Sequence, residues 1–157
     1  MSFLLFCMGI LYANAVEYVV HRYLFHGLGR KKGSIFSFHL REHHTTARRN
    51  GFEDRKVSAN EAIGLPVLIA THLPLSVIAP TFFSALVVYA VAFGVLHNYQ
   101  HRHPEFTKKY FPWHWDHHMG NPNKSWGVVL PIMDWLTGTL EKPFDSQEWS
   151  CYIVVRG

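Results

Sequence analysis

Cysteine and charged residues are scarce in this chain of 157 residues. Two cysteines, Cys7 and Cys151, are too few for a scaffold built on disulfides. Charged side chains make up 17% of the residues and apolar ones 48%, whereas soluble domains average about 25% charged residues. This composition excludes a disordered chain, a coiled coil and a collagen-like fibre, and the length predicts a single domain over residues 1–157.

Charge is missing altogether from long stretches of the chain. Before Arg22 the sole charged residue is Glu17, and none occurs between Glu61 and Arg102. A net charge of +4 and a pI near 9.2 could suggest nucleic-acid binding. The alternation of uncharged apolar stretches with basic stretches is instead typical of a membrane protein. We therefore expect no nucleic-acid partner.

The uncharged stretches predict an all-α integral membrane protein with about three transmembrane helices. The first is expected near residues 2–24, since about 20 residues at ~1.5 Å each cross a hydrocarbon core of ~30 Å. The later uncharged run is too long for one span and fits a hairpin of residues 60–78 and 80–101. A cleaved signal peptide and a soluble bundle with two long buried helices are the alternatives. The N-terminus lacks the basic start that a signal peptide needs.

Basic residues indicate the orientation in the membrane. Residues 25–59 hold eight Lys and Arg, and residues 102–157 hold six. By the positive-inside rule, both segments face the cytoplasm of a bacterium or the cytoplasmic face of the endoplasmic reticulum. Cys7 and Cys151 then lie on opposite sides of the membrane and are not expected to pair. The tryptophans expected at the headgroup level are Trp113, Trp115 and Trp126.

Histidine is unusually abundant, with 12 copies. Ten of them form four short clusters, each at or beyond the predicted cytoplasmic end of a span. The clusters are His21 and His26; His39, His43 and His44; His97 and His101; and His114, His117 and His118. The topology derives from charge alone, so the gathering of all four clusters on one side supports it independently. A histidine-rich helical cap holding metal is therefore expected on the cytoplasmic face.

The spacing within the clusters is typical of metal ligands on helices. Residues three or four apart share a helix face, which pairs His97 with His101, pairs His39 with His43, and groups the three histidines of the fourth cluster. His21 and His26 are five apart, so either they serve two metals or the helix ends between them. Imidazole binds Zn, Cu, Fe and Ni, and at about four to six ligands per ion the ten histidines suffice for two ions.

The two remaining histidines are expected to have ordinary roles. His72 lies inside a predicted span beside Pro74, where a hydrogen bond between packed helices is expected. His103 precedes Pro104 and is expected to be a loop residue.

The order of the clusters resembles the fatty acid hydroxylase and sterol desaturase superfamily of integral-membrane di-metal oxygenases. The spacings HxxxxH, HxxxHH, HxxxH and HxxHH occur in that order. The stretch from Glu17 through His21-Arg22 resembles the family's acidic residue before its first His-Arg, and Pro131–Thr139 resembles its closing P-x-x-D-x-L-x-G-T signature. The resemblance covers about residues 17–140, and the combined pattern is far more specific than any one cluster.

The resemblance implies a membrane-bound di-iron monooxygenase that hydroxylates a C–H bond of a fatty acyl, sterol-like or related membrane lipid. It implies two iron ions, which zinc could replace in the purified protein. It also implies O2 and electrons from a cytochrome b5- or ferredoxin-type donor. The implied ligands are His21, His26, His39, His43, His44, His97, His101, His114, His117 and His118. Desaturation, demethylation, aldehyde deformylation and carotenoid-ring hydroxylation stay open as alternatives. A non-enzymatic zinc-binding membrane protein or metal carrier is a weaker one.

Two carboxylates are candidates for supporting the ligands. Glu17 lies one helical turn before His21, and Asp116 lies within the fourth cluster, so either could accept an imidazole N–H and select its tautomer. Glu17 could equally be a buried charge paired with Arg22 or Arg41. Asp134 resembles a turn or cap residue. The basic residues near the clusters either set the orientation of the protein in the membrane or bind an anionic headgroup.

Overall fold

The computed structural model describes residues 2–56 and 59–141, and every regular element within these ranges is a helix. The predicted all-α class is confirmed. Cys151 lies outside the described residues, so its expected separation from Cys7 stays a prediction.

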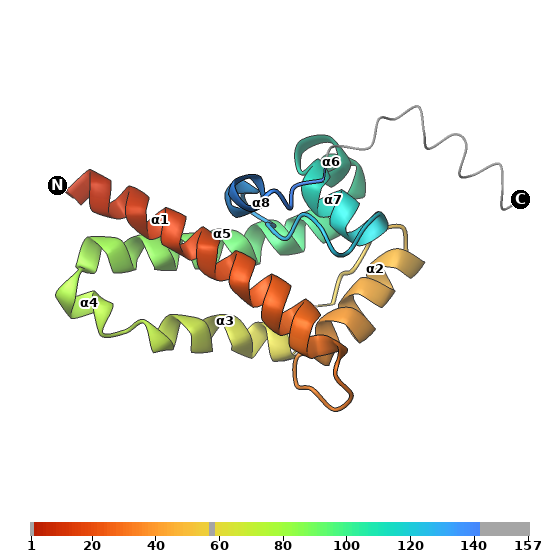
Figure 1. The fold of residues 1–157 in the computed structure, drawn as a ribbon, viewed down its shortest axis with the longest axis horizontal. Helices are drawn as coiled ribbons and strands as arrows, with labels where there is room; N and C mark the ends of the chain where they lie inside the picture. The colour runs from red at the N-terminus through yellow and green to blue at the C-terminus, as the bar shows by residue number, and fades with distance from the viewer. Residues whose placement is uncertain (1, 57–58, 142–157) are drawn as a thin grey trace, which may run out of the picture.

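Two long helices pack against each other over much of their length and form the frame of the molecule (Figure 1). The first is α1 (Ser2–Val19), which continues without interruption through η1 (Val20–Gly27) and η2 (Leu28–Arg30). The second is α5 (Pro80–Arg102). Both are long and apolar enough to cross a membrane.

The outer surfaces of these helices are apolar and uncovered. Phe3 at the start of α1 is 80% exposed, and Val88, Val91 and Val95 along α5 are all more than half exposed. A soluble bundle would bury such side chains, since soluble monomers rarely expose contiguous apolar surface of this kind. The exposed faces therefore favour a lipid environment over the soluble alternative.

A close approach between α1 and α5 depends on Gly9. A Cβ at this position would lie 2.7 Å from the Cβ of Ala85 and 2.8 Å from the carbonyl oxygen of Phe82. Both distances are shorter than non-bonded atoms tolerate. Small residues allow helices to pack closely where no hydrophobic effect drives them together, as in lipid.

The segment expected as a second span, residues 60–78, is two helices rather than one. It consists of α3 (Ala59–Thr71) and α4 (Leu75–Ile78), joined by a turn at His72 and Leu73. Pro74 has no N–H to donate, which favours a break here, whereas Pro66 is accommodated inside α3. The apolar part of α3 is shorter than a full span, so a third crossing stays a prediction.

His72 has the packing role expected of it. Its Nε2 lies 3.1 Å from the hydroxyl of Tyr12 on α1, and its Nδ1 lies 2.8 Å from the carbonyl oxygen of Leu68. The turn between α3 and α4 is thereby tied to α1.

Short helices gather at the other end of the α1–α5 pair (Figure 1). They are η3 (His39–His44), α2 (Thr45–Arg49), α6 (Pro104–Tyr110) and α7 (Pro112–Met119). Proline at the first position begins α5, α6 and α7, where its fixed φ suits a helix start and its missing N–H costs no hydrogen bond. This helical end holds the four histidine clusters, and its orientation toward the cytoplasm stays a prediction.

The chain then returns along the long helices into α8 (Ile132–Thr137). Asp134 accepts hydrogen bonds from the backbone N–H of Trp126 at 2.9 Å, from that of Gly127 at 2.7 Å, and from the hydroxyl of Thr139 at 2.7 Å. Gly138 ends the helix in the left-handed conformation, at φ 68°. Asp134 thus has the turn and cap role that the sequence indicated.

We expect Gly9→Ala to destabilise the fold, because the new methyl group meets the backbone of α5. Overpacking of this kind costs about 1–3 kcal/mol, against a gain in helix propensity of about 1 kcal/mol. Gly64→Ala in α3 is the matched control, since nothing lies within 4 Å of its Cβ. Thermal unfolding in detergent should show a lower Tm for Gly9→Ala alone. An equal Tm for both variants would contradict the close crossing.

Candidate metal centre

Nine histidines converge in two adjacent groups between the ends of the long helices. The ligand atoms within each group lie within 4.8 Å of one another. The first group consists of His21, His26, His39, His44 and His117, and the second of His43, His97, His101 and His118. The groups are in contact, since the stacked rings of His44 and His118 have centroids 4.1 Å apart.

A π-helix brings His21 and His26 together. Element η1 is wound so that an N–H bonds the carbonyl five residues earlier, as Leu28 does with Tyr23. Residues five apart then lie on one face, and both histidines join the first group. Neither sequence-based alternative is correct, since the helix does not end between them and they do not serve different groups.

A second π-helix, η3, sorts the next cluster in the same way. His39 and His44, five apart, face the first group, while His43 belongs to the second. The expected pairing of His39 with His43 assumed a regular α-helix and is wrong. Short π-helical segments occur often at functional sites, and here each one sets the ligand register.

Regular helices supply the remaining ligands. His97 and His101 on α5 share one face and one group, as the spacing predicted. On α7 the adjacent His117 and His118 divide between the two groups, so this helix lies between them. The expectation that all three histidines of α7 point the same way is wrong.

His114 lies beside the second group rather than in it. Its ring centroid is 4.8 Å from that of His118 and 5.0 Å from that of His101. Its Nδ1 bonds the side-chain oxygen of Gln100, and its buried Nε2 has no hydrogen-bond partner among the described residues. Whether it binds a metal stays a prediction.

Oxygen acceptors outside the groups orient four of the rings. In the first group, Nδ1 of His21 lies 2.5 Å from the carbonyl oxygen of Trp126, and Nδ1 of His117 lies 2.7 Å from that of Lys124. A carbonyl can only accept, so each Nδ1 carries the proton and each Nε2 presents a lone pair to the group. This is the arrangement by which proteins fix the tautomer of a metal-binding histidine.

The second group is oriented by the loop of residues 50–56. Nδ1 of His101 lies 2.9 Å from the carbonyl oxygen of Phe52, and Nδ1 of His43 lies 2.9 Å from Oδ2 of Asp54. Burial lowers the pKa of His43 well below its ordinary value, so the contact with Asp54 is a hydrogen bond from a neutral ring. No spacing in the sequence marked Asp54 as a partner of His43.

The lone pairs that face inward fit a bound cation. Nε2 of His21 lies 3.0 Å from Nε2 of His39, and Nε2 of His117 lies 3.2 Å from Nε2 of His26. In the second group, buried Nε2 atoms of His43, His101 and His118 have no hydrogen-bond partner among the described residues. Each unsatisfied buried group costs about 1–3 kcal/mol, which a metal ion would offset.

Burial keeps the rings uncharged. Desolvation by burial is the main cause that lowers histidine pKa values here, and charge repulsion from neighbouring imidazoles adds to it. The residues outside the long helices with pKa values well below 6.5 are His39, His43, His44, His114, His117 and His118. Neutral imidazole is the form that binds metals, so these rings are in the ligand form at neutral pH.

Two strained residues lie where the backbone aims its carbonyls at the rings. Phe52 has φ 82° and Ser125 has φ 55°, and they are the non-glycine residues with positive φ in the described part of the chain. Phe52 supplies the carbonyl that orients His101 and also stacks on its ring, with centroids 4.4 Å apart. Ser125 lies between Lys124 and Trp126, whose carbonyls orient the first group. Strain of this kind concentrates at functional sites.

A family comparison agrees with this geometry. The model of the fatty acid hydroxylase family matches residues 6–139. The chain belongs to the fatty acid hydroxylase family. No curated protein and no solved structure matched it.

Membership makes the protein an oxidoreductase of a membrane-associated, metal-dependent class. Both histidine groups lie entirely inside the matched range. The recognition of this family from its histidine spacing and its closing signature is therefore confirmed.

In this member of the family, Glu17 supports a loop rather than a ligand ring. Its buried carboxylate accepts hydrogen bonds from the hydroxyl of Tyr89 and from the backbone N–H of Val128 and Val129. Among the described residues, neither a histidine nor an arginine donates to it. The expected support of His21 comes instead from the carbonyl that this loop presents, so Glu17 acts on the ligand through the backbone.

Asp116, the other carboxylate candidate, is buried on α7 between His114 and His117 along the chain. Its expected role in fixing a tautomer stays a prediction. Arg48 bonds the carbonyl oxygens of His118 at 2.7 Å and Gly120 at 3.1 Å, which caps the end of α7. This contact gives Arg48 a structural role besides topology.

Trp126 is buried inside the protein and does not present its ring to a membrane interface as the sequence suggested. It is 4% exposed, and its ring packs against His26 and His117 with centroids 4.9 and 5.3 Å away. The loop that Asp134 holds places it there, as an apolar wall of the first group.

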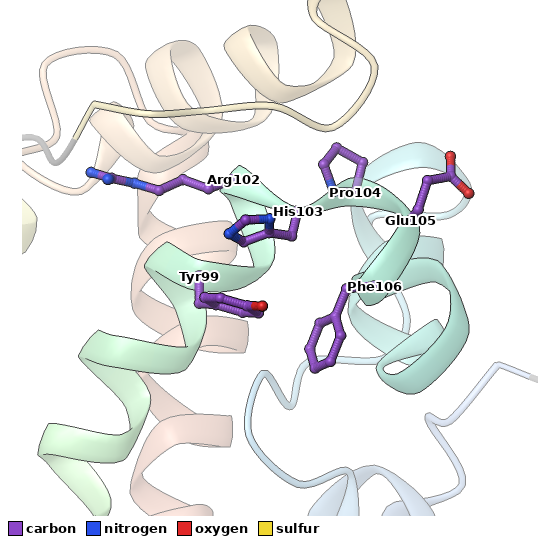
Figure 2. Close-up of a pocket in the computed structure, with 6 residues that line it drawn as sticks. All are labelled: Tyr99, Arg102, His103, Pro104, Glu105 and Phe106. Atoms are coloured by element: carbon purple, nitrogen blue, oxygen red, sulfur yellow. The ribbon is translucent and has the colours of Figure 1, made fainter.

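A shallow hollow at the junction of α5 and α6 lies outside the metal centre. Figure 2 shows the rings of Tyr99, His103 and Phe106 around it, with Arg102 and Glu105 directed away on opposite sides. None of its lining residues belongs to either histidine group. His103 therefore offers a control for histidine substitutions.

We expect Asp54→Ala to weaken metal binding by the second group. Loss of a partner that orients a ligand costs about 10–100-fold in metal affinity. Glu53→Ala is the matched control, because Glu53 is half-exposed and its side chain pairs only with Arg55 among the described residues. After dialysis against a chelator, Asp54→Ala should lose the ion of the second group and keep that of the first, so its metal content should fall by about half. The metal content of Glu53→Ala should stay unchanged. Equal metal content in the two variants would show that Asp54 does not support a ligand.

Proposed function

We propose that this protein uses O2 and two iron ions to hydroxylate a C–H bond of a membrane lipid. The two adjacent groups of buried, uncharged histidines carry this proposal, within a family of metal-dependent oxygenases. The reaction consumes one O2, two electrons and two protons, converts C–H to C–OH and releases one water. A cytochrome b5- or ferredoxin-type donor supplies the electrons.

When bound, the iron ions supply the oxidising power that an unactivated C–H bond requires and that no side chain has. The chain's own residues hold them. Five neutral rings would hold one ion and four the other. Nδ1 hydrogen bonds to carbonyls and to Asp54 orient four of these rings, those of His21, His43, His101 and His117. The rings contribute no negative charge, in contrast to the carboxylate-rich sites of soluble di-iron bundles.

The number of rings argues against the zinc-scaffold alternative. Structural zinc sites are almost always closed by four ligands, whereas the first group brings five histidines together. Zinc can still occupy imidazole sites after purification, so metal content alone does not identify the working metal.

The substrate is proposed to arrive along α5 from the bilayer. His97 is the one member of the two groups that is not fully buried. The ring of Phe93, one turn toward the apolar part of α5, stacks on it with centroids 5.4 Å apart. An acyl chain lying against this face would bring its carbon to the edge of the second group without passing through water.

This route implies that the metal centre lies at one face of the membrane. We place it on the cytoplasmic side of a bacterial inner membrane or of the endoplasmic reticulum, supported by the positive-inside distribution of Lys and Arg. A soluble electron donor could reach it there. The two apolar helices and the family's membrane association support a multi-pass arrangement.

Desaturation on the same scaffold is the second candidate. It shares the metal centre, the donor and the lipid substrate, and it differs in removing two hydrogens instead of adding oxygen. The family comparison covers lipid oxygenases of both kinds, while the closing signature at Pro131–Thr139 favours the hydroxylase.

We expect His117→Ala to abolish both activity and metal binding in the first group, since it removes an oriented ligand. His103→Ala is the control, because this ring is exposed and lies outside both groups. Lipid extracts of a lipid-rich host expressing each variant should be compared by mass spectrometry. A product gaining one oxygen, present with wild type and His103→Ala and absent with His117→Ala, is the expected result.

Other outcomes distinguish the alternatives. A product lacking two hydrogens would assign a desaturase. Unchanged lipids with all variants, combined with two tightly held zinc ions, would support the scaffold. Unchanged metal content in His117→Ala would refute the assignment of this histidine as a ligand.

A further inference from the structure

The C-terminal part of the described chain has an unusually uncharged surface. Asp134 is the one charged residue between Lys124 and Glu141. It is fully buried and turned inward, onto the backbone N–H groups of Trp126 and Gly127. The outward side of residues 126–140 therefore carries no charge.

This segment packs against the apolar part of α1 rather than only against the histidine end. The amide of Asn14 donates to the carbonyl of Leu130 at 2.8 Å and accepts from the N–H of Met133 at 3.2 Å. Asn14 precedes His21 by about two helical turns, which is about 10 Å along α1. In Figure 1, α8 accordingly lies beside the long helices, nearer the N-terminus of α1 than α6 and α7 are.

Four consecutive backbone N–H groups of the loop before α8, those of residues 126–129, are satisfied from inside the protein. Glu17 accepts from two N–H groups of the loop, and Asp134 accepts from two more. The hydroxyls of Thr137 and Thr139 lie 3.0 and 3.4 Å from the hydroxyl of Tyr18 on α1. Irregular backbone is tolerated at membrane depth only under this condition. These hydrogen bonds also explain why the polar residues Asn14 and Glu17 occur in α1, since polar residues are rare in membrane-spanning helices.

The face of α8 turned away from α1 is apolar and uncovered. Trp135 is 72% exposed and Leu136 is 62% exposed. Hydrogen bonds of Met133 to Asn14 and of Thr137 to Tyr18 place α8 alongside residues 14–18 of α1. Leu11, about one helical turn before Asn14, is also exposed and apolar. The exposed face of α8 thus continues the outer apolar surface of the long helices.

We infer that α8 and its preceding loop form a re-entrant element whose exposed face binds the acyl chains of the bilayer. The segment expected to be cytoplasmic, residues 102–157, would then dip back into the membrane over residues 126–140. The element would seal the lipid side of the first histidine group, since Trp126 lies between α8 and those rings. The inference rests on the membrane placement in the proposed function.

Nitroxide accessibility tests it in the metal-loaded protein, reconstituted into vesicles of phosphatidylcholine and phosphatidylglycerol. In a background with Cys7→Ser and Cys151→Ser, single cysteines are introduced as Trp135→Cys and Leu136→Cys. Both positions are exposed, so the changes remove little packing, and either variant can replace the other if one fails to fold. Val88→Cys on α5 is the lipid reference, and Lys109→Cys on α6 is the water reference.

We expect labels at 135 and 136 to be reached by O2 and shielded from a water-soluble nickel chelate. Their ratio of oxygen to nickel accessibility should match that at 88 and exceed that at 109 several-fold. Ratios at 135 and 136 equal to that at 109, with 88 still in lipid, would overturn the inference and leave the proposed function intact. A water-like ratio at 88 would overturn the membrane placement itself, and with it both proposals.

Discussion

The structure depends on holding uncharged imidazole lone pairs against one another inside an apolar frame. Such an arrangement is unfavourable by itself, because each inward Nε2 has lost water and faces another acceptor. Rigid elements on every side hold the rings in place. Two π-helices set the register of five ligands, and α5 and α7 supply the other four. Oxygen acceptors outside the groups hold the Nδ1 atoms of four rings.

The surrounding fold serves this arrangement through backbone carbonyls. Carbonyl oxygens of Phe52, Lys124 and Trp126 each orient a ring, and strained residues lie at or beside all three. Glu17 and Asp134 hold the loop that carries Trp126. The carbonyl of Trp126 orients His21, so two carboxylates that do not touch this ring help to position it. The acidic residue of the first motif and the aspartate of the closing motif thus act on one loop.

Membrane chemistry gives a reason for this division of labour. Polar side chains within an apolar helix are costly unless they are paired. Asn14 and Glu17 are paired with the backbone of the returning segment, and the same hydrogen bonds satisfy backbone groups of that segment. The same contacts provide hydrogen bonds for the polar side chains of α1 and hold α8 against α1. They also position the loop that carries Trp126, the apolar wall of the first histidine group.

The sequence by itself determined the helical class, the two longest apolar segments and the family, because hydropathy, charge distribution and histidine spacing are local properties of the chain. It also marked all nine grouped histidines. It could not determine how they divide, because counting along a regular α-helix separates His21 from His26 and pairs His39 with His43. Only the tertiary structure decided this, since packing selects the π-helical turns. The sequence also could not predict the hydrogen-bond partners of the histidines, Asp54, Phe52 and Trp126. Each contacts its histidine from a loop, and no periodicity in the sequence encodes such a contact.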